Sequence, residues 1–139
     1  MLKIGSLVKI LFIFILSFTY VNANEINDKA ALNGIKEAKS VFLIDFTNVK
    51  KTAFYLNIIE GTHKGFVSQG VKPDMVLVFI GETVKYLSTK QDEAFEMENE
   101  EDLISIQKSI KTLASLGVRM EVCAVATKVF NVDNSTIPK

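Results

Sequence analysis

The chain has 139 residues, of which sixteen are basic and sixteen are acidic, so its formal net charge is zero. A length of this order suits a single domain that folds around its own hydrophobic core, without a metal or a disulfide framework. Because the chain has no basic excess that would attract phosphates, we expect no nucleic-acid partner.

The first part of the chain, residues 1–23, has the three parts of a secretory signal peptide. Two lysines, Lys3 and Lys9, precede a mostly apolar run over residues 10–18. The small-residue sequence Val-Asn-Ala follows at residues 21–23. The apolar run is shorter than the roughly 20 residues that a bilayer span needs. We therefore expect cleavage after Ala23, a mature protein in the periplasm or secreted, and no stable membrane insertion after cleavage.

The mature chain opens with a polar segment and then a predicted strand and helix. Residues 24–39 are mixed in composition and carry no motif, whereas residues 41–46 (VFLIDF) form a nearly continuous apolar run. Such a run is typical of a strand that is buried on both faces of a parallel sheet. Asn48 is a candidate helix cap, and apolar residues at helical spacing predict a helix from near Val49 until Gly70 ends it.

The alternation of strand and helix then repeats. Residues 75–80 (MVLVFI) predict a second strand, which Gly81 ends before a short helix. The acidic segment 91–102 leads into a further helix, for which Asn99 is the expected cap and Gly117 the left-handed stop. The apolar stripe of that helix consists of Leu103, Ile106, Ile110 and Leu113.

The last predicted elements are a strand over residues 118–123 (VRMEVC) and a short helix over residues 124–130. Strands that alternate with helices at these spacings predict an α/β fold, a three-layer sandwich with a mainly parallel sheet and right-handed crossovers. The chain has no internal repeat and no low-complexity linker. We therefore predict one α/β domain over residues 24–139.

Cys123 is the only cysteine of the chain and the main candidate for chemistry. In an oxidising compartment a lone thiol is buried and inert, paired with another molecule, or kept reactive. Cys123 falls at the carboxyl end of a predicted strand, the edge at which open α/β sheets place their ligands. It also directly precedes a helix start, where amide groups stabilise a thiolate. The other interpretation is a small buried hydrophobe in the core.

Further candidates follow the other two predicted strands at the same edge of the sheet. Asp45 closes the first strand and Asn48 lies just beyond it, while Gly81 and Thr83 follow the second strand. We predict that these residues line a substrate pocket with Cys123. Turn and cap chemistry is the more common role of residues such as Asp45 and Asn48.

The remaining polar and small residues favour structural roles. His63 is in helical register with the apolar face of its helix, which predicts a histidine of the core or of an interface. Gly61 and Gly65 each cost about 1 kcal/mol relative to alanine in a helix. Close approach of another helix or subunit, or a poorly formed helix middle, explains them. Because no phosphate-binding loop, nucleophile elbow or Cys/His cluster is present, we expect no metal and no cofactor.

Several segments together resemble the DsrE/DsrF-like family, over about residues 40–137. The first is VFLIDF with the Leu56-Asn57 pair in the following helix. The second is KPDMVLVFIGETVKYLS at residues 72–88, and the third is GVRMEVCAVATKVFNV at residues 117–132. The last two are similar to the exported branch of the family, in which a Gly-Val strand ends in a cysteine followed by a short helix.

The resemblance implies a flavodoxin-like domain, assembly into a small homo-oligomer and sulfur transfer through a persulfide on Cys123, which matches the cysteine position of the family. A protein that donates or accepts sulfur is then an implied partner. The alternative is a non-catalytic oligomeric binding or scaffold domain in which Cys123 is structural. Family members usually continue through a further C-terminal strand where this chain stops at Lys139, so we expect that strand to be missing.

Overall fold

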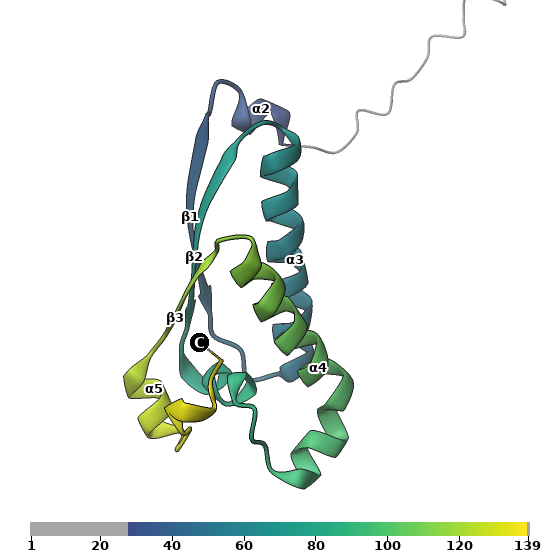
Figure 1. Cartoon of the computed structure of the whole chain (residues 1–139), viewed down its shortest axis with the longest axis vertical. Helices are drawn as coiled ribbons and strands as arrows, with labels where there is room; N and C mark the ends of the chain where they lie inside the picture. The colour runs from purple at the N-terminus through teal and green to yellow at the C-terminus, as the bar shows by residue number, and fades with distance from the viewer. Residues whose placement is uncertain (1–27, 139) are drawn as a thin grey trace, which may run out of the picture. The chain divides into compact units, whose positions relative to one another are not determined.

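The computed structural model describes residues 28–138 (Figure 1). The chain divides into two units, Met1–Ala31 and Leu32–Lys139, and every described strand belongs to the second unit. The predicted signal peptide lies outside the described residues. None of the helices in the described part of the chain has the length and apolar character of a membrane span.

The second unit contains a three-stranded parallel sheet in the order β1-β2-β3, with helices between the strands (Figure 1). The predicted α/β class with a mainly parallel sheet is confirmed. In chain order the elements are α2 (Lys29–Leu32), β1 (Glu37–Ile44), α3 (Val49–Ser68), β2 (Lys72–Phe79), the 3-10 helix η1 (Gly81–Leu87), α4 (Glu93–Ser115), β3 (Arg119–Val122), α5 (Ala124–Val129) and the 3-10 helix η2 (Asn134–Thr136).

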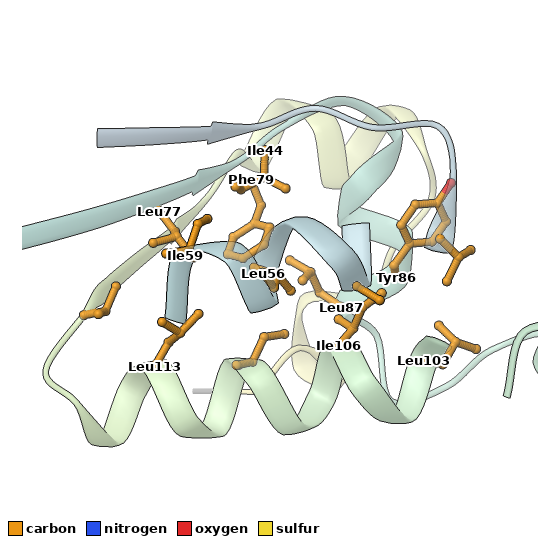
Figure 2. Packing of buried hydrophobic residues seen from close by; sticks show 14 of the residues in the cluster. Ile44, Leu56, Ile59, Leu77, Phe79, Tyr86, Leu87, Leu103, Ile106 and Leu113 are labelled. Carbon is orange, nitrogen blue, oxygen red and sulfur yellow. The ribbon is translucent and has the colours of Figure 1, made fainter. Parts of the chain in front are cut away.

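The core lies between one face of the sheet and the helices α3 and α4, which pack against each other (Figure 1). Consecutive strands joined by right-handed crossovers place both connecting helices on the same face. Figure 2 shows Leu77 and Phe79 of β2 pointing toward Leu56 and Ile59 of α3, with Leu113 of α4 facing them. All five side chains are almost fully buried, so this layer supplies most of the hydrophobic stabilisation.

The opposite face of the sheet is partly open along β1. Val41 and Leu43 are 71% and 58% exposed, although the continuous apolar run around them predicted burial on both faces. Their register partners Val76 and Val78 on β2 are only half-buried. That prediction is wrong for β1 because both described crossover helices lie on the other face.

β1 and β2 begin earlier than their apolar runs suggested, whereas β3 begins one residue later, and β2 includes a proline. Pro73 is tolerated because it lies in the part of β2 that β3 does not reach, since β3 pairs only with residues 76–79. Lys72 N–H donates to Lys36 O at 2.9 Å, so the neighbouring Pro73 turns its missing N–H away from β1. The polar residues before the apolar run therefore extend β2 in the part of the sheet where it pairs with β1 alone.

The start of α4 differs from the prediction. The helix begins at Glu93 and is capped by Asp92, whose Oδ1 accepts from Ala94 N at 3.1 Å. Asn99 does not cap it: its φ of −122° and ψ of 19° interrupt the helix, and its Nδ2 donates to Phe95 O at 2.9 Å. The acidic segment is thus helical on both sides of a kink at Asn99. The helix begins at Glu93 because Asp92, and not Asn99, caps its N-terminus.

The helix α3 is continuous through Gly61 and Gly65, so a poorly formed helix middle is wrong. Apart from the chain neighbours and the adjacent backbone of α3 itself, no described atom lies within 4 Å of a Cβ placed at either glycine. Within residues 28–138 no other helix therefore makes the expected close approach, and contact with another subunit stays a prediction. His63 is buried on the core side of α3, as predicted for a core histidine.

Candidate functional site

The carboxyl ends of all three strands meet at one edge of the sheet. Ile80 N–H donates to Ile44 O and Cys123 N–H donates to Phe79 O, each at 3.0 Å. These bonds carry the strand register past the last paired residues. The turns that follow β1, β2 and β3 therefore lie along the edge at which open α/β sheets bind their ligands.

Cys123 occupies the N-cap position of α5. Its backbone is held on both sides, because its N–H bonds to Phe79 O and its carbonyl accepts from Thr127 N at 3.0 Å. Its side chain makes no capping hydrogen bond, and the residue is half-buried. The two backbone hydrogen bonds of Cys123 therefore fix where its side chain leaves the main chain.

The short helix α5 is anchored against η1. Ala126 and Thr127 are buried, and α5 and η1 are in contact. At the end of the helix, the Lys85 ammonium lies 5.9 Å from the centroid of the Phe130 ring, within the range of a cation–π interaction. Docking onto η1, rather than a side-chain cap, holds the turn that carries Cys123.

Asp45 and Gly81 lie close together, while the pocket that they were expected to form with Cys123 stays a prediction. Gly81 has a φ of +57°, and a Cβ at this position would overlap the Oδ1 atom of Asp45. Only glycine combines this backbone conformation with such a close approach. The exposed Asp45 carboxylate therefore rests against the backbone at the start of η1.

Thr83 and Asn48 use their polar atoms within the fold. The buried Thr83 hydroxyl accepts from Phe46 N at 2.6 Å and donates to Phe46 O at 3.0 Å, which ties η1 to the turn after β1. Asn48 Oδ1 accepts from Lys51 N at 2.8 Å and caps α3. Both residues line the predicted edge, but the side chains are engaged in structural hydrogen bonds.

Asp45 is not adjacent to Cys123, because β2 separates the strands that end in these residues. At the usual spacing of neighbouring strands, two strand positions correspond to about 10 Å. The carboxylate is therefore too distant for direct proton transfer to or from the thiol. Within residues 28–138 no three His, Cys, Asp or Glu side chains are grouped so that they would bind a metal.

A cavity of about 520 Å³ lies beside this edge, and Cys123 is not among its lining residues. Its walls carry Lys85 and Lys90, the rings of Phe95 and Phe130, and Asp133. Hydrogen bonds from the backbone and side chain of the nearby serine lower the pKa of Asp133, and the Lys90 charge adds to this. The sequence analysis missed these residues, because they come from two distant segments that each resemble ordinary polar surface.

A buried tyrosine lies behind the same cavity. Tyr86 stacks on Phe95 with ring centroids 6.1 Å apart. Burial raises the pKa of the Tyr86 phenol above its usual 10.0, and the negative charge of Glu82 raises it further. Tyr86 therefore stays neutral at physiological pH and acts as part of the core.

Comparison with known proteins identifies one family. The model of the DsrE/DsrF-like family matches residues 38–138, which include every strand except the first residue of β1, together with Cys123. Neither a curated protein nor a solved structure matches the chain at a significant level.

Proposed function

Because the chain belongs to the DsrE/DsrF-like family, we propose that it is a sulfur-relay protein that carries sulfane sulfur as a persulfide on Cys123. The observation that carries the proposal is the half-buried thiol of Cys123, which caps a helix without a side-chain hydrogen bond. The chain has no second cysteine with which this thiol would form an internal disulfide. The family supports sulfur relay as the class of chemistry, and the Cys123 thiol is the group on which the sulfur would be carried.

The proposed reaction is an exchange of sulfur between thiolates. The Cys123 thiolate attacks the terminal sulfur of a donor persulfide or polysulfide, and a new S–S bond forms. The electron pair of the broken S–S bond leaves with the donor, which becomes a thiolate or a polysulfide that is one sulfur atom shorter. An acceptor thiolate then attacks the outer sulfur and releases the Cys123 thiolate. Neither step changes the total oxidation state, so no external oxidant or reductant is needed.

The positions of the neighbouring groups support a carrier rather than a hydrolytic enzyme. Asp45 is about two strand positions away, which leaves its carboxylate out of reach of the Cys123 thiol. The exchange of sulfur between thiolates depends on the thiolate form of the cysteine and on its exposure to the donor, and it depends less on proton transfer. A sulfur donor and a sulfur acceptor are then the partners of the site.

We also propose that the protein acts outside the cytoplasm, after removal of residues 1–23. The support is the sequence pattern alone: basic residues, a short apolar run and a small-residue cleavage motif. N-terminal sequencing of the protein from its native host tests this directly. A mature N-terminus at Asn24 supports export, and an intact N-terminus in the cytoplasmic fraction contradicts it.

The carrier function is tested by intact-mass measurement after exposure of the folded protein to inorganic polysulfide. We expect the wild type to gain the mass of a sulfur atom, to lose it on addition of a thiol acceptor, and the Cys123→Ser variant to gain none. Protection of the native thiol from both polysulfide and an alkylating reagent would support the scaffold alternative instead.

A matched control separates the position of Cys123 from the mere presence of a thiol. The variant Ser115→Cys/Cys123→Ser carries its only cysteine at the exposed end of α4, before the start of β3, whereas Cys123 follows the end of β3. We expect its thiol to load and release sulfur more slowly than Cys123. Equal rates of sulfur loading and release in the two proteins would show that the turn before α5 does not increase the reactivity of its cysteine. That result would overturn the proposed site.

A further inference from the structure

The cavity of about 520 Å³ beside the strand edge is formed by two segments that lie far apart in the sequence. Residues 85–95 run across the end of η1 and the start of α4, and residues 130–136 follow α5. The volume falls within the range of about 300–1,000 Å³ that is typical of small-molecule sites. The next two residues, Ile137 and Pro138, line a separate groove beside β3. The cavity is therefore a candidate ligand site of its own.

Hydrogen bonds join the two segments and hold the walls of the cavity in place. The Ser88 and Thr136 hydroxyl oxygens are 2.7 Å apart, and Thr89 N–H donates to Thr136 O at 2.9 Å. Gln91 Nε2 donates to the carbonyl oxygens of Lys85 and Ser88, each at 2.8 Å. Because these bonds lie within the fold and do not involve a ligand, the cavity is preformed, as small-molecule sites usually are.

Two phenyl rings form the apolar part of the cavity. Phe95 and Phe130 are both half-buried, and each comes from a different segment. Phe95 stacks on the buried ring of Tyr86, which does not itself line the cavity. The Lys85 ammonium lies 5.9 Å from the centroid of the Phe130 ring. Rings that are positioned in this way offer stacking and edge contacts to the ring of a ligand.

The charged side chains that line the cavity are balanced in sign. Lys85 and Lys90 are the cations, and Asp92 and Asp133 are the anions. The Lys85 ammonium already forms an ion pair with Glu82, whereas Lys90 forms no ion pair with any residue in the range 28–138. A ligand with a single charge would be attracted by one pair of these groups and repelled by the other. The balance therefore favours a ligand that carries both signs.

Lys90 and Asp133 form an incomplete pair at the cavity. Hydrogen bonds from Ser135 lower the pKa of Asp133, and the Lys90 charge adds to this, so the two charged groups are near each other. They nevertheless form no ion pair. Ser135 N–H donates to Asp133 Oδ1 at 2.8 Å, and an ionised carboxylate accepts about four hydrogen bonds, so Asp133 can accept more. A ligand with adjacent carboxylate and ammonium groups would complete both partners.

From the balanced charges, the incomplete pair and the two rings together, we propose that the cavity binds a free aromatic α-amino acid in its zwitterionic form. The ligand carboxylate lies against the Lys90 ammonium, and the ligand ammonium lies against the Asp133 carboxylate. Charge-assisted hydrogen bonds at both groups orient the ligand, and its ring lies between Phe95 and Phe130. Because Cys123 does not line the cavity, this site and the proposed sulfur chemistry can each fail without the other.

Isothermal titration calorimetry of the full-length gene product tests the site with L-phenylalanine as the probe. Three analogues each lack one of the groups that the cavity recognises: phenylpropionate lacks the ammonium, phenylethylamine lacks the carboxylate, and L-alanine lacks the ring. We expect each analogue to bind at least about tenfold more weakly, because each leaves part of the cavity without its partner. The absence of saturable binding of L-phenylalanine, or an analogue that binds as tightly, would overturn the proposal.

Substitution of the two charged groups tests the orientation of the ligand. Lys90→Gln should raise the Kd for L-phenylalanine about tenfold and should not weaken phenylethylamine, which has no carboxylate for Lys90 to bind. Asp133→Asn keeps a capping acceptor for η2. It should raise the Kd for L-phenylalanine about tenfold and should not weaken phenylpropionate, which has no ammonium. Equal weakening of L-phenylalanine and of the analogue in either variant would contradict the assigned contacts.

Two controls separate the cavity from general effects of charge and from the sulfur site. Lys128→Gln removes the same charge from an exposed lysine of α5 that does not line the cavity, so the Kd for L-phenylalanine should stay unchanged. Cys123→Ser should also bind L-phenylalanine with the wild-type Kd. If Lys128→Gln weakens binding as much as Lys90→Gln does, Lys90 is not a ligand contact and the proposal fails.

Discussion

The turns after β1 and β3 each lead to the N-cap residue of a helix, and the two capping side chains differ in their hydrogen bonds. Asn48 caps α3 through a hydrogen bond from Lys51 N, and the Thr83 hydroxyl ties the same turn through both backbone groups of Phe46. Cys123 caps α5 without any side-chain hydrogen bond. The comparison shows that one edge of the sheet contains one turn whose capping side chain makes a structural hydrogen bond and another whose capping side chain makes no such bond.

The two helices that follow these turns explain why the difference is tolerated. α3 has 20 residues and a long buried face, whereas α5 has 6 residues and depends on docking against η1. A cap contributes to helix formation only about 1 kcal/mol, so tertiary contacts can replace it. The turn with Cys123 therefore needs η1 more than it needs a capping side chain.

The largest effect is expected where the first turn meets η1, at Gly81. Gly81→Ala introduces a side chain at a φ of +57° that also overlaps Asp45 Oδ1, so we expect a loss of about 3 kcal/mol in unfolding free energy. Urea denaturation measures this loss. Gly117→Ala is the control, because Gly117 has a φ of +81° with no neighbour in contact range and should lose only about 1 kcal/mol. Equal losses would show that the Asp45 contact contributes nothing.

The next effect concerns the hydroxyl that joins the turn to η1. Thr83→Val keeps the shape of the side chain but leaves the N–H and C=O of Phe46 without partners, so we expect a loss of about 2 kcal/mol. Thr83→Ser keeps the hydroxyl and should lose about 1 kcal/mol for the missing methyl group. Thermal unfolding compares the two, and a valine variant as stable as the serine variant would contradict the role of these bonds.

A smaller effect is expected at the cap of α3. Asn48→Ala removes the acceptor for Lys51 N and should cost about 1 kcal/mol, whereas Asn48→Asp keeps an acceptor and should cost little. Equilibrium urea denaturation of the two variants distinguishes them. If alanine and aspartate behave alike, the cap hydrogen bond does not stabilise the turn, and the contrast with Cys123 disappears.

The smallest effect is expected at the equivalent cap of α5. Cys123→Ser replaces a half-buried thiol that makes no capping bond, so the unfolding free energy should change by less than about 0.5 kcal/mol. Differential scanning calorimetry of wild type and variant measures the shift. A loss near that of Asn48→Ala would indicate that Cys123 is a structural residue, which favours the scaffold alternative over the carrier.

Local patterns in the sequence determined much of this protein. The apolar runs predicted all three strands, Asn48 and Gly117 marked a helix start and a helix end, and the α4 stripe proved to be buried. These features depend on contacts between residues that are near one another in the chain, or on burial that recurs with a fixed period. The position of Cys123 at a strand end followed from the same local signals.

Only the tertiary structure decided how those elements are covered and connected. The exposure of Val41 and Leu43 depends on which face receives both crossover helices, and an apolar run does not contain that information. The Thr83 bonds join residues 37 positions apart, and the large cavity combines the segment around Lys90 with the one around Phe130. Such arrangements arise from packing between distant segments, because a side chain acquires its neighbours only after the sheet and its helices have assembled.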